Sequence, residues 1–185
     1  MKTSATADFA TLAERLGATT VRVVDGRNGA GSGVVWSAAG TIVTNAHVVR
    51  SMYPTVLFAD GRRARAALLD RDPECDLALL RIEGALTGRL SAAHVRDERT
   101  LRAGELLVAV GNPYGLVGAL STGIFRGHKG RFVVADLRLA PGNSGGPLAD
   151  AEGRVVGINS MVANGLALAV PAGTVNAFLA SARAA

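Results

Sequence analysis

Short apolar runs, five to nine residues long, recur along most of this chain and are separated by Gly, Asp, Asn and Pro. They are rich in Val, Ile, Leu and Thr, which is typical of β-strands bounded by turns. The runs cover residues 20–24, 32–37, 41–45, 55–59, 64–70 and 76–82, and then 106–111, 119–127, 131–136, 154–160 and 165–171. Because no long helices alternate with these runs, the pattern predicts an all-β chain of antiparallel sandwiches or barrels.

Helical spacing is confined to the two ends of the chain. Phe9, Leu12 and Leu16 follow one another at helical intervals, and Gly17 is a natural stop. The closing segment repeats this spacing on one face with Val175, Phe178, Leu179 and Ala182. We therefore expect one short helix at each end. A polar stretch from about Leu86 to Arg102 separates the two groups of strands and is the predicted linker.

The composition is that of a compact globular chain. Of its 185 residues 49% are apolar and 19% are charged, and the 23 glycines follow no fixed period, which excludes disorder and collagen-like repeats. This length fits one ordinary domain or two small ones. No apolar run approaches the roughly 20 residues of a membrane-spanning helix. Cys75 is the only cysteine, so no internal disulfide is expected.

Charged residues interrupt the N-terminal stretch where an export signal needs an unbroken apolar core. Asp8, Glu14 and Arg15 all lie within the first 17 residues. As it stands, the chain is therefore predicted to be cytoplasmic. A periplasmic or other extracytoplasmic location stays open if a signal or anchor has been removed.

Two basic clusters contribute to the net charge of +5, each beside an expected turn. They consist of Arg62, Arg63 and Arg65, and of Arg126, His128, Lys129 and Arg131. No aromatic residues interleave with these charges, so we interpret both as solvated loop faces and predict no nucleic-acid partner.

Ser144 lies in the stretch GNSGG and is the candidate nucleophile. Peptide hydrolysis by serine needs a hydroxyl, a base, a carboxylate that orients the base, and amide donors for the oxyanion. The flanking glycines would let backbone N–H groups approach a substrate carbonyl, which makes the amides of Gly142 and Ser144 the candidate oxyanion donors. The same letters also fit an ordinary glycine-rich turn, and the motif alone leaves both interpretations open.

The base must be one of the three histidines, and His47 is the best placed. It follows the apolar run 41–45, and a strand there would hold its ring rigidly, whereas His94 and His128 lie in polar, turn-like surroundings. A lone histidine is nevertheless often a structural or surface residue.

For the carboxylate, Asp76 opens the apolar run 76–82 and could be shielded there, whereas Asp72 and Glu74 are expected to be solvated. Chain order then separates two serine chemistries. An α/β-hydrolase needs its histidine after the serine, and no histidine follows Ser144. The order His47, Asp76, Ser144 is that of the chymotrypsin-like triad.

At this point the sequence resembles the trypsin-like fold, and within it the HtrA/Deg group of bacterial serine proteases. The resemblance is carried by GSGVVWSAAGTIVTNAHVV, DPECDLALLRI, GNPYGL and PGNSGGPL, followed by VVGINS and GLALAVP in the same order. It implies two six-stranded antiparallel β-barrels: an N-terminal helical segment over 1–18, a first barrel over 19–95 with His47 and Asp76, and a second over 96–185 with Ser144 and the closing helix. It further implies a serine endopeptidase that acts on proteins or peptides through an acyl-enzyme.

The resemblance also implies residues that hold the substrate. Ser160, Met161 and Val162 would form the strand that pairs with the substrate backbone. The walls of the first specificity pocket would be Leu139, Val162, Gly165, Leu166 and Ala167. Because Val162 stands where many relatives with deep pockets have Gly, we expect a small aliphatic side chain before the scissile bond.

Several features depart from the group. Arg138 stands where the group usually has a small residue. If its side chain points into the first pocket, acidic substrate side chains would be preferred; if it points away, Leu139 defines an apolar pocket. We expect the second arrangement, because burial of an unpaired guanidinium is costly. In contrast to chymotrypsin-type zymogens, which have an acidic residue just before the serine to pair with a newly freed N-terminus, this chain has neutral Asn143, so activation by N-terminal cleavage is not expected. The loop after STGIF is short, and no PDZ domain follows the closing helix in these residues.

Three further expectations complete the prediction. No His or Cys cluster has metal-ligand spacing, so neither a metal nor a cofactor is predicted. Cys75 is expected to be a buried small residue rather than a redox switch. Relatives often assemble through their N-terminal segment, so a homo-oligomer is possible, although we expect Phe9, Leu12 and Leu16 to pack on their own barrel. A catalytically silent peptide-binding or chaperone-like module with the same fold stays open as the alternative function.

Overall fold

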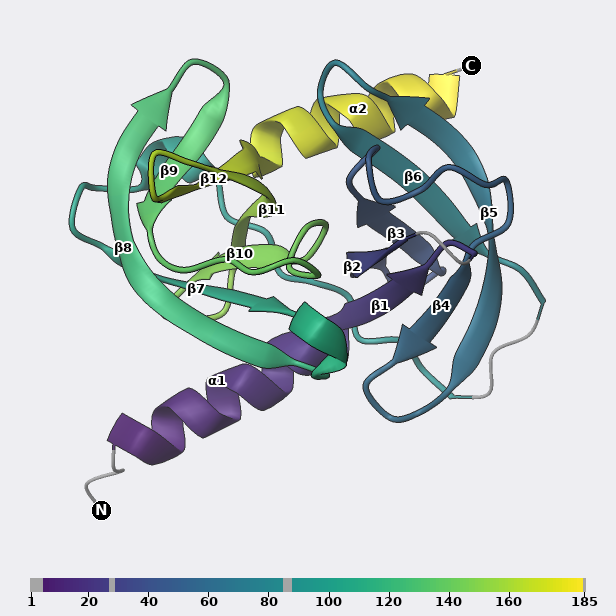
Figure 1. Cartoon of the computed structure of the whole chain (residues 1–185), viewed down its shortest axis with the longest axis horizontal. Coiled ribbons are helices and arrows are strands. Elements are labelled where there is room, and N and C mark those ends of the chain that lie inside the picture. Colours follow the sequence, from purple (N-terminus) through teal and green to yellow (C-terminus); the bar gives the residue numbers. More distant parts are fainter. Residues whose placement is uncertain (1–4, 27–28, 85–87, 185) are drawn as a thin grey trace.

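Twelve strands form two closed six-stranded antiparallel barrels (Figure 1) in the computed structural model, which describes residues 5–26, 29–84 and 88–184. The first barrel consists of β1 (Thr20–Val24), β2 (Ala30–Ser37), β3 (Thr41–Thr44), β4 (Thr55–Phe58), β5 (Arg63–Asp72) and β6 (Leu77–Ile82). The second consists of β7 (Leu106–Gly111), β8 (Ala119–Lys129), β9 (Phe132–Asp136), β10 (Pro147–Asp150), β11 (Val155–Ala163) and β12 (Leu166–Pro171). This is the chymotrypsin-like architecture that the sequence predicts.

The two barrels have the same strand order. Around the ring the first runs β1-β2-β3-β6-β5-β4, and the second repeats this order as β7-β8-β9-β12-β11-β10. Each barrel encloses its own apolar core, built around Val23, Ile42 and Leu80 in the first and around Leu107 and Leu148 in the second, all of them fully buried. Alternation along each strand supplies these inward side chains.

A third apolar cluster holds the barrels together beneath the C-terminal helix. Helix α2 (Ala172–Ala184) crosses the top of both barrels (Figure 1). Its Val175, Phe178 and Leu179 are buried against Leu77 of the first barrel and Ile158 of the second. The predicted apolar face of the closing helix is confirmed, and it fixes how the two barrels meet.

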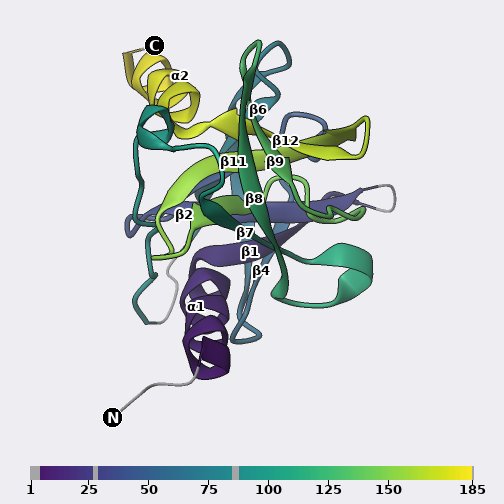
Figure 2. The same ribbon diagram turned by 90° about the vertical axis from the view of Figure 1, so that its left-hand side faces the viewer.

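The N-terminal helix packs on the second barrel. Helix α1 (Ala5–Thr19) buries Leu12 and Leu16 against Val108 and Ala149, whereas Phe9 remains partly exposed. Figure 2 shows α1 and α2 at opposite ends of the molecule. Neither helix is long and apolar enough to cross a membrane, as far as the described residues extend.

All eleven predicted strands are present, but a twelfth, β10, was not predicted. Its four residues are flanked by Gly145 and Gly146 and begin with Pro147, so no apolar run marks it. Proline is tolerated at the first residue of a strand. The predicted linker begins at Leu86, which lies outside the described residues; after it, the 3-10 helix η1 (Glu98–Thr100) and a bridge from Val95 to Val155 are the regular features described.

Candidate active site

His47 and Asp76 lie side by side at one end of the first barrel. His47 lies just after β3, and Asp76 directly precedes β6, the strand that pairs with β3. The His47 Nδ1 atom lies 2.9 Å from Asp76 Oδ1 and 3.0 Å from Oδ2, and the His47 backbone N–H also donates to Oδ1. Asp76 adopts a positive φ of 55°, which is uncommon outside glycine and typical of functional positions.

The charge on Asp76 sets the tautomer of His47. Burial would raise the pKa of Asp76, but hydrogen bonds from His47 and Ser160 outweigh burial and hold this pKa below its ordinary value. An ionised carboxylate can only accept hydrogen bonds, so Nδ1 of His47 carries the proton. The Nε2 atom of the neutral ring is then left with a lone pair, as a general base requires.

Ser144 lies in the second barrel, in the loop before β10, and this loop packs against the first barrel. The backbone N–H of Ser32 in β2 donates to the Ser144 carbonyl at 2.8 Å. A Cβ atom on Gly145, which has a φ of +86°, would overlap the Ser32 carbonyl oxygen and the Thr44 hydroxyl. Glycine is therefore required here for the close approach of the two barrels.

The amides of Gly142 and Ser144 have no hydrogen-bond partner in the described part of the chain. The peptide C=O before each of them is bound elsewhere: Pro141 O accepts from Tyr114 N–H at 3.3 Å, and Asn143 O accepts from Gly146 N–H at 3.0 Å. In a trans peptide the N–H points opposite to its C=O. Both amides therefore face away from these loop contacts and are available to an external acceptor.

Ser160 connects the two halves of the site. It is 3% exposed; its hydroxyl donates to Asp76 Oδ2 at 2.5 Å, and its carbonyl accepts from the Ser144 hydroxyl at 3.0 Å. The structure thus joins His47, Asp76 and Ser144 through one buried residue of β11. Within the described residues, no hydrogen bond joins the Ser144 hydroxyl to His47, so in this conformation the hydroxyl rests on β11.

Two residues that sequence reasoning missed support the loop that carries Ser144. The hydroxyl of Ser32, which is fully buried, donates to the Gly142 carbonyl at 2.7 Å. The same oxygen accepts from the Asn112 backbone N–H at 2.9 Å and from its side-chain amide at 3.0 Å. Ser32 lies in GSGVVWS and Asn112 in GNPYGL, two of the motifs that carry the family resemblance. The sequence of these motifs does not indicate that Ser32 and Asn112 form a hydrogen bond between the two barrels.

The residues expected to pair with substrate lie on an unpaired strand edge. Strand β10 pairs with β11 only as far as Ile158. Beyond that point Asn159 bonds to the loop residues Gly145 and Gly146, and Met161 and Val162 are exposed. This edge of β11 therefore begins directly beside Ser144.

The expected walls of the first pocket are only partly brought together. Leu139 is half-buried against the core of the second barrel, and Ala167 belongs to that core. Gly165 and Val162 are exposed at the β11–β12 hairpin. Leu166 lies on the opposite face of the sheet, where it lines a different cavity. Arg138 is exposed, so its guanidinium is not part of the barrel interior.

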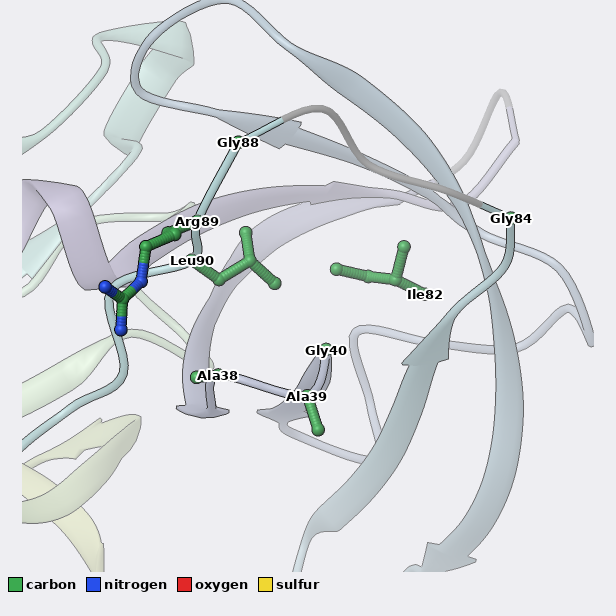
Figure 3. A pocket seen from close by; sticks show the side chains of 8 residues that line it. All are labelled: Ala38, Ala39, Gly40, Ile82, Gly84, Gly88, Arg89 and Leu90. Atoms are coloured by element: carbon green, nitrogen blue, oxygen red, sulfur yellow. The ribbon is translucent and has the colours of Figure 1, made fainter.

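Two cavities of the first barrel differ in their chemistry. One of about 360 Å³ lies at the β2–β3 turn, where Ile82 and Leu90 point toward one another while Arg89 points away (Figure 3). Its described lining contains no histidine, carboxylate or hydroxyl. Another of about 560 Å³ adjoins His47 and is lined also by Arg50 and Tyr53.

The remaining candidate chemistry concerns metal-ligating side chains and the single cysteine. The described residues contain no group of three or more His, Cys, Asp or Glu side chains that could hold a metal ion. A hydrogen bond to Asp72, together with burial, raises the pKa of the Cys75 thiol, and half-buried Cys75 packs against the apolar cluster beneath α2. A raised pKa disfavours the reactive thiolate.

Two closed barrels, with a histidine–aspartate pair from one and a glycine-flanked serine from the other, constitute the arrangement of chymotrypsin-like serine peptidases. The chain belongs to the family of trypsin-like peptidase domains, which matches residues 31–158. Its curated relatives are HtrA-type and DegP-like proteases, so the chain is a peptidase domain of the HtrA type.

The relatives come from animals, plants and bacteria, so the group is wider than the bacterial one that the sequence suggested. Serine protease HTRA4 of Homo sapiens is 38% identical over 164 residues, which is 81% of this chain and 34% of that protein. Protease Do-like 1, chloroplastic, of Arabidopsis thaliana is 36% identical over 183 residues, 89% of this chain and 42% of that protein. A probable periplasmic serine endoprotease DegP-like of Bartonella henselae is 38% identical over 161 residues, 78% and 31% respectively. The chain thus spans between 31% and 42% of the length of these relatives.

Proposed function

We propose that this chain is an active serine endopeptidase that uses His47, Asp76 and Ser144 as its catalytic triad and acts on protein or peptide substrates. The observation that carries the proposal is the double role of Ser160, which bonds to Asp76 through its hydroxyl and to Ser144 through its carbonyl. Residues from two separate barrels are thereby brought to one point. The protease relatives support the same activity.

In the proposed reaction, the Ser144 hydroxyl rotates away from the Ser160 carbonyl toward His47. Nε2 accepts its proton while Oγ attacks the scissile carbonyl carbon, and the oxyanion is bound by the amides of Gly142 and Ser144. Asp76 stabilises the imidazolium that forms. His47 then gives the proton to the leaving amine. In the second half of the reaction, His47 accepts a proton from the attacking water and returns it to Ser144 Oγ as the acyl-enzyme is hydrolysed.

The substrate backbone would pair with the free edge of β11. The hairpin after this strand turns at Asn164 and Gly165, which have φ of 51° and 76°, as a two-residue type I′ turn requires. Ala163 and Leu166 flank this turn as a hydrogen-bonded pair, so the next pair, Val162 and Ala167, is not hydrogen-bonded. Val162 therefore directs its N–H and C=O to the free edge, where they can hold an extended peptide.

A small aliphatic residue before the scissile bond suits the pocket beside this edge. Leu139 and Ala167 belong to the apolar core of the second barrel, and exposed Val162, which pairs with Ala167, would narrow the opening. Arg138 is exposed and does not supply a buried charge. A profile of cleaved peptide libraries should therefore show Ala, Val or Ile before the cleaved bond, and a dominance of Asp or Glu would contradict this assignment.

The resting contact of Ser144 with Ser160 also supports the alternative of a silent peptide-binding module, in which the hydroxyl never reaches His47. A fluorophosphonate probe separates the two functions, since it reacts only with an activated serine. Labelling that is lost in Ser144→Ala supports the enzyme. A folded chain that is not labelled, yet binds extended peptides, supports the module.

A further inference from the structure

Asn45 connects the two segments of the first barrel that carry His47 and Asp76. It directly follows β3 and stands two positions before His47 in the stretch TNAHVV. Asn45 is fully buried, and its Nδ2 atom donates a hydrogen bond to the Asp76 backbone carbonyl at 2.9 Å. Its own backbone carbonyl accepts from the Val48 N–H at 3.2 Å, which closes the turn that contains His47. One buried residue is thus bonded to both segments.

The strand pairing shows why a side chain is needed at this point. Strands β3 and β6 pair as far as Thr44, which lies opposite Ala78. Beyond this pair the ladder stops, because residues 46–48 form a turn and Asp76 has a φ of 55°. A buried backbone carbonyl still needs a donor where a ladder ends. The side-chain amide of Asn45 supplies that donor to Asp76.

The backbone conformation of Asp76 depends on contacts that enforce it. Left-handed backbone is unfavourable for a residue with a side chain and persists only where its surroundings determine it. The Asp76 carboxylate is held by His47 and Ser160, and the carbonyl of the same residue is held by Asn45. Without the amide, this carbonyl is free to turn. Asp76 can then relax to a negative φ, which moves its carboxylate away from Nδ1 of His47.

The other end of the Asn45 amide supports a role beyond stability. Its Oδ1 atom is buried and has no hydrogen-bond partner in the described part of the chain. An unsatisfied buried acceptor destabilises the folded state, and an apolar side chain of similar size would avoid this cost. The amide cannot turn over, because Oδ1 would then face the Asp76 carbonyl, a second acceptor. A destabilising group is therefore retained beside the candidate pair, which is typical of functional sites.

We propose that Asn45 is a positioning residue of the candidate active site: its amide holds the Asp76 backbone in the conformation in which the carboxylate meets Nδ1 of His47. The inference rests on the proposed peptidase function, because only there does the orientation of His47 affect a rate. Asn45 acts through Asp76 and not on the substrate. Its loss therefore slows the chemical step and leaves substrate binding, assigned above to the edge of β11, in place.

Two variants remove the donor without opening a large cavity. Asn45→Leu replaces the amide by an apolar group of similar size, and Asn45→Asp keeps the shape but places an acceptor against the Asp76 carbonyl. Both should lower kcat by about 10²-fold, the usual effect of a displacement of about 1 Å at a catalytic group, and change KM by less than about twofold. Circular dichroism identifies a variant that does not fold, and the other variant then carries the test.

Thr19→Val is the matched control. Thr19 is also buried, and its hydroxyl donates to a backbone carbonyl, that of Leu16, at 2.9 Å. The variant removes one buried hydrogen bond at the end of α1 and should keep kcat. An unchanged kcat in the folded Asn45 variants would overturn the proposal. A loss of kcat that is equal in Thr19→Val and in the Asn45 variants would also overturn it, because it would reflect general destabilisation.

A measurement that does not depend on cleavage keeps this inference apart from the peptidase. In nuclear magnetic resonance spectra, the Nδ1 proton of His47 gives a sharp signal while its bond to Asp76 protects it from exchange with water. The signal should be present in Ser144→Ala and lost when Asn45→Asp is added. This loss, in a chain that cleaves no peptide even with Ser144 in place, would support the role of Asn45 while refuting the peptidase. A signal that persists in the double variant, or that is absent already in Ser144→Ala, would refute the role of Asn45.

Discussion

The two barrels share one strand order but hold their parts of the candidate site in different ways. The first barrel fixes its pair firmly, since Asp76 accepts from His47 through three contacts and from Ser160 through a fourth. The second barrel presents Ser144 on a loop. The Ser144 hydroxyl donates to β11, and the amides of Gly142 and Ser144 have no hydrogen-bond partner among the described residues. The difference suggests that the base is preorganised, whereas the nucleophile has to rotate before it reacts.

Removal of the nucleophile should have the largest effect. Ser144→Ala is expected to lower kcat by about six orders of magnitude, as in other serine triads. Because the hydroxyl makes a single hydrogen bond, the melting temperature should change by at most about 4 °C. Peptide cleavage and calorimetry measure the two effects. Residual cleavage at the original rate would assign the activity to another residue or to a contaminant.

A change of the carboxylate tests whether the first barrel acts through the tautomer. Asp76→Asn should lower kcat by about 10⁴, because an amide can donate to Nδ1 and would leave the proton on Nε2. Asp72→Asn is the matched control: this nearby carboxylate accepts from the Cys75 N–H and does not touch His47. Comparable losses in both variants would rule out a specific role for Asp76.

The contact between barrels tests whether the serine loop depends on the first barrel. Ser32→Ala should lower kcat by about 10²–10³, the cost of a lost oxyanion donor, with little change in KM. It should also lower the free energy of unfolding by about 1–3 kcal/mol, since the Gly142 carbonyl and Asn112 amides lose a buried partner. Ser181→Ala removes a hydroxyl from α2 and should leave kcat intact. An increase in KM with an unchanged kcat would argue against a role of Ser32 in the oxyanion site.

An ion cluster anchors the second barrel and should make it acid-sensitive. The Asp150 side chain is 2% exposed and pairs with Arg96 and Arg154. Burial would raise its pKa, but hydrogen bonds from Arg154 and Arg96 hold it below the ordinary value. The folded chain thus binds the proton less tightly than the unfolded chain, so this stabilisation is complete above about pH 4 and is lost as the pH falls through the folded pKa.

Asp150→Asn should therefore lower the free energy of unfolding by about 3 kcal/mol at pH 7 and flatten its decline below pH 4. Denaturant titrations between pH 3 and pH 7 measure both effects. Asp60→Asn, at an exposed turn of the first barrel, is the control and should change the curve little. An unchanged slope in Asp150→Asn would show that other carboxylates govern the acid transition.

The smallest effect is expected at Arg138. Its side chain is exposed, so Arg138→Ala should change the preference for the residue before the scissile bond by no more than about threefold, as for other surface charges. Cleavage profiles of the two proteins make the comparison. A loss of an acidic preference in the variant would place the guanidinium inside the pocket.

Most strands, both helices and the class of the fold can be predicted from local patterns in the chain. Short apolar runs separated by turn residues predicted eleven strands, helical spacing predicted both end helices, and the order of His47, Asp76 and Ser144 selected the chymotrypsin-like arrangement. These features are local or depend only on chain order. The short apolar runs reflect strands that are buried on one face or, as in β3, at every residue. Strand β10 was not predicted, because its four residues begin with Pro147 and follow two glycines, a pattern that is typical of a turn.

The contacts between distant residues depend on how the chain folds in three dimensions. Ser32 and Asn112 are 80 residues apart and join beneath Gly142, and Ser160 reaches across 84 residues to Asp76. Leu166 and Ala167 are neighbours in the chain, yet they face opposite sides of β12, and only the pairing with β9 and β11 shows which side holds the core. Composition carries no information on such contacts, because they arise when two closed barrels pack and a buried polar group must find its partner.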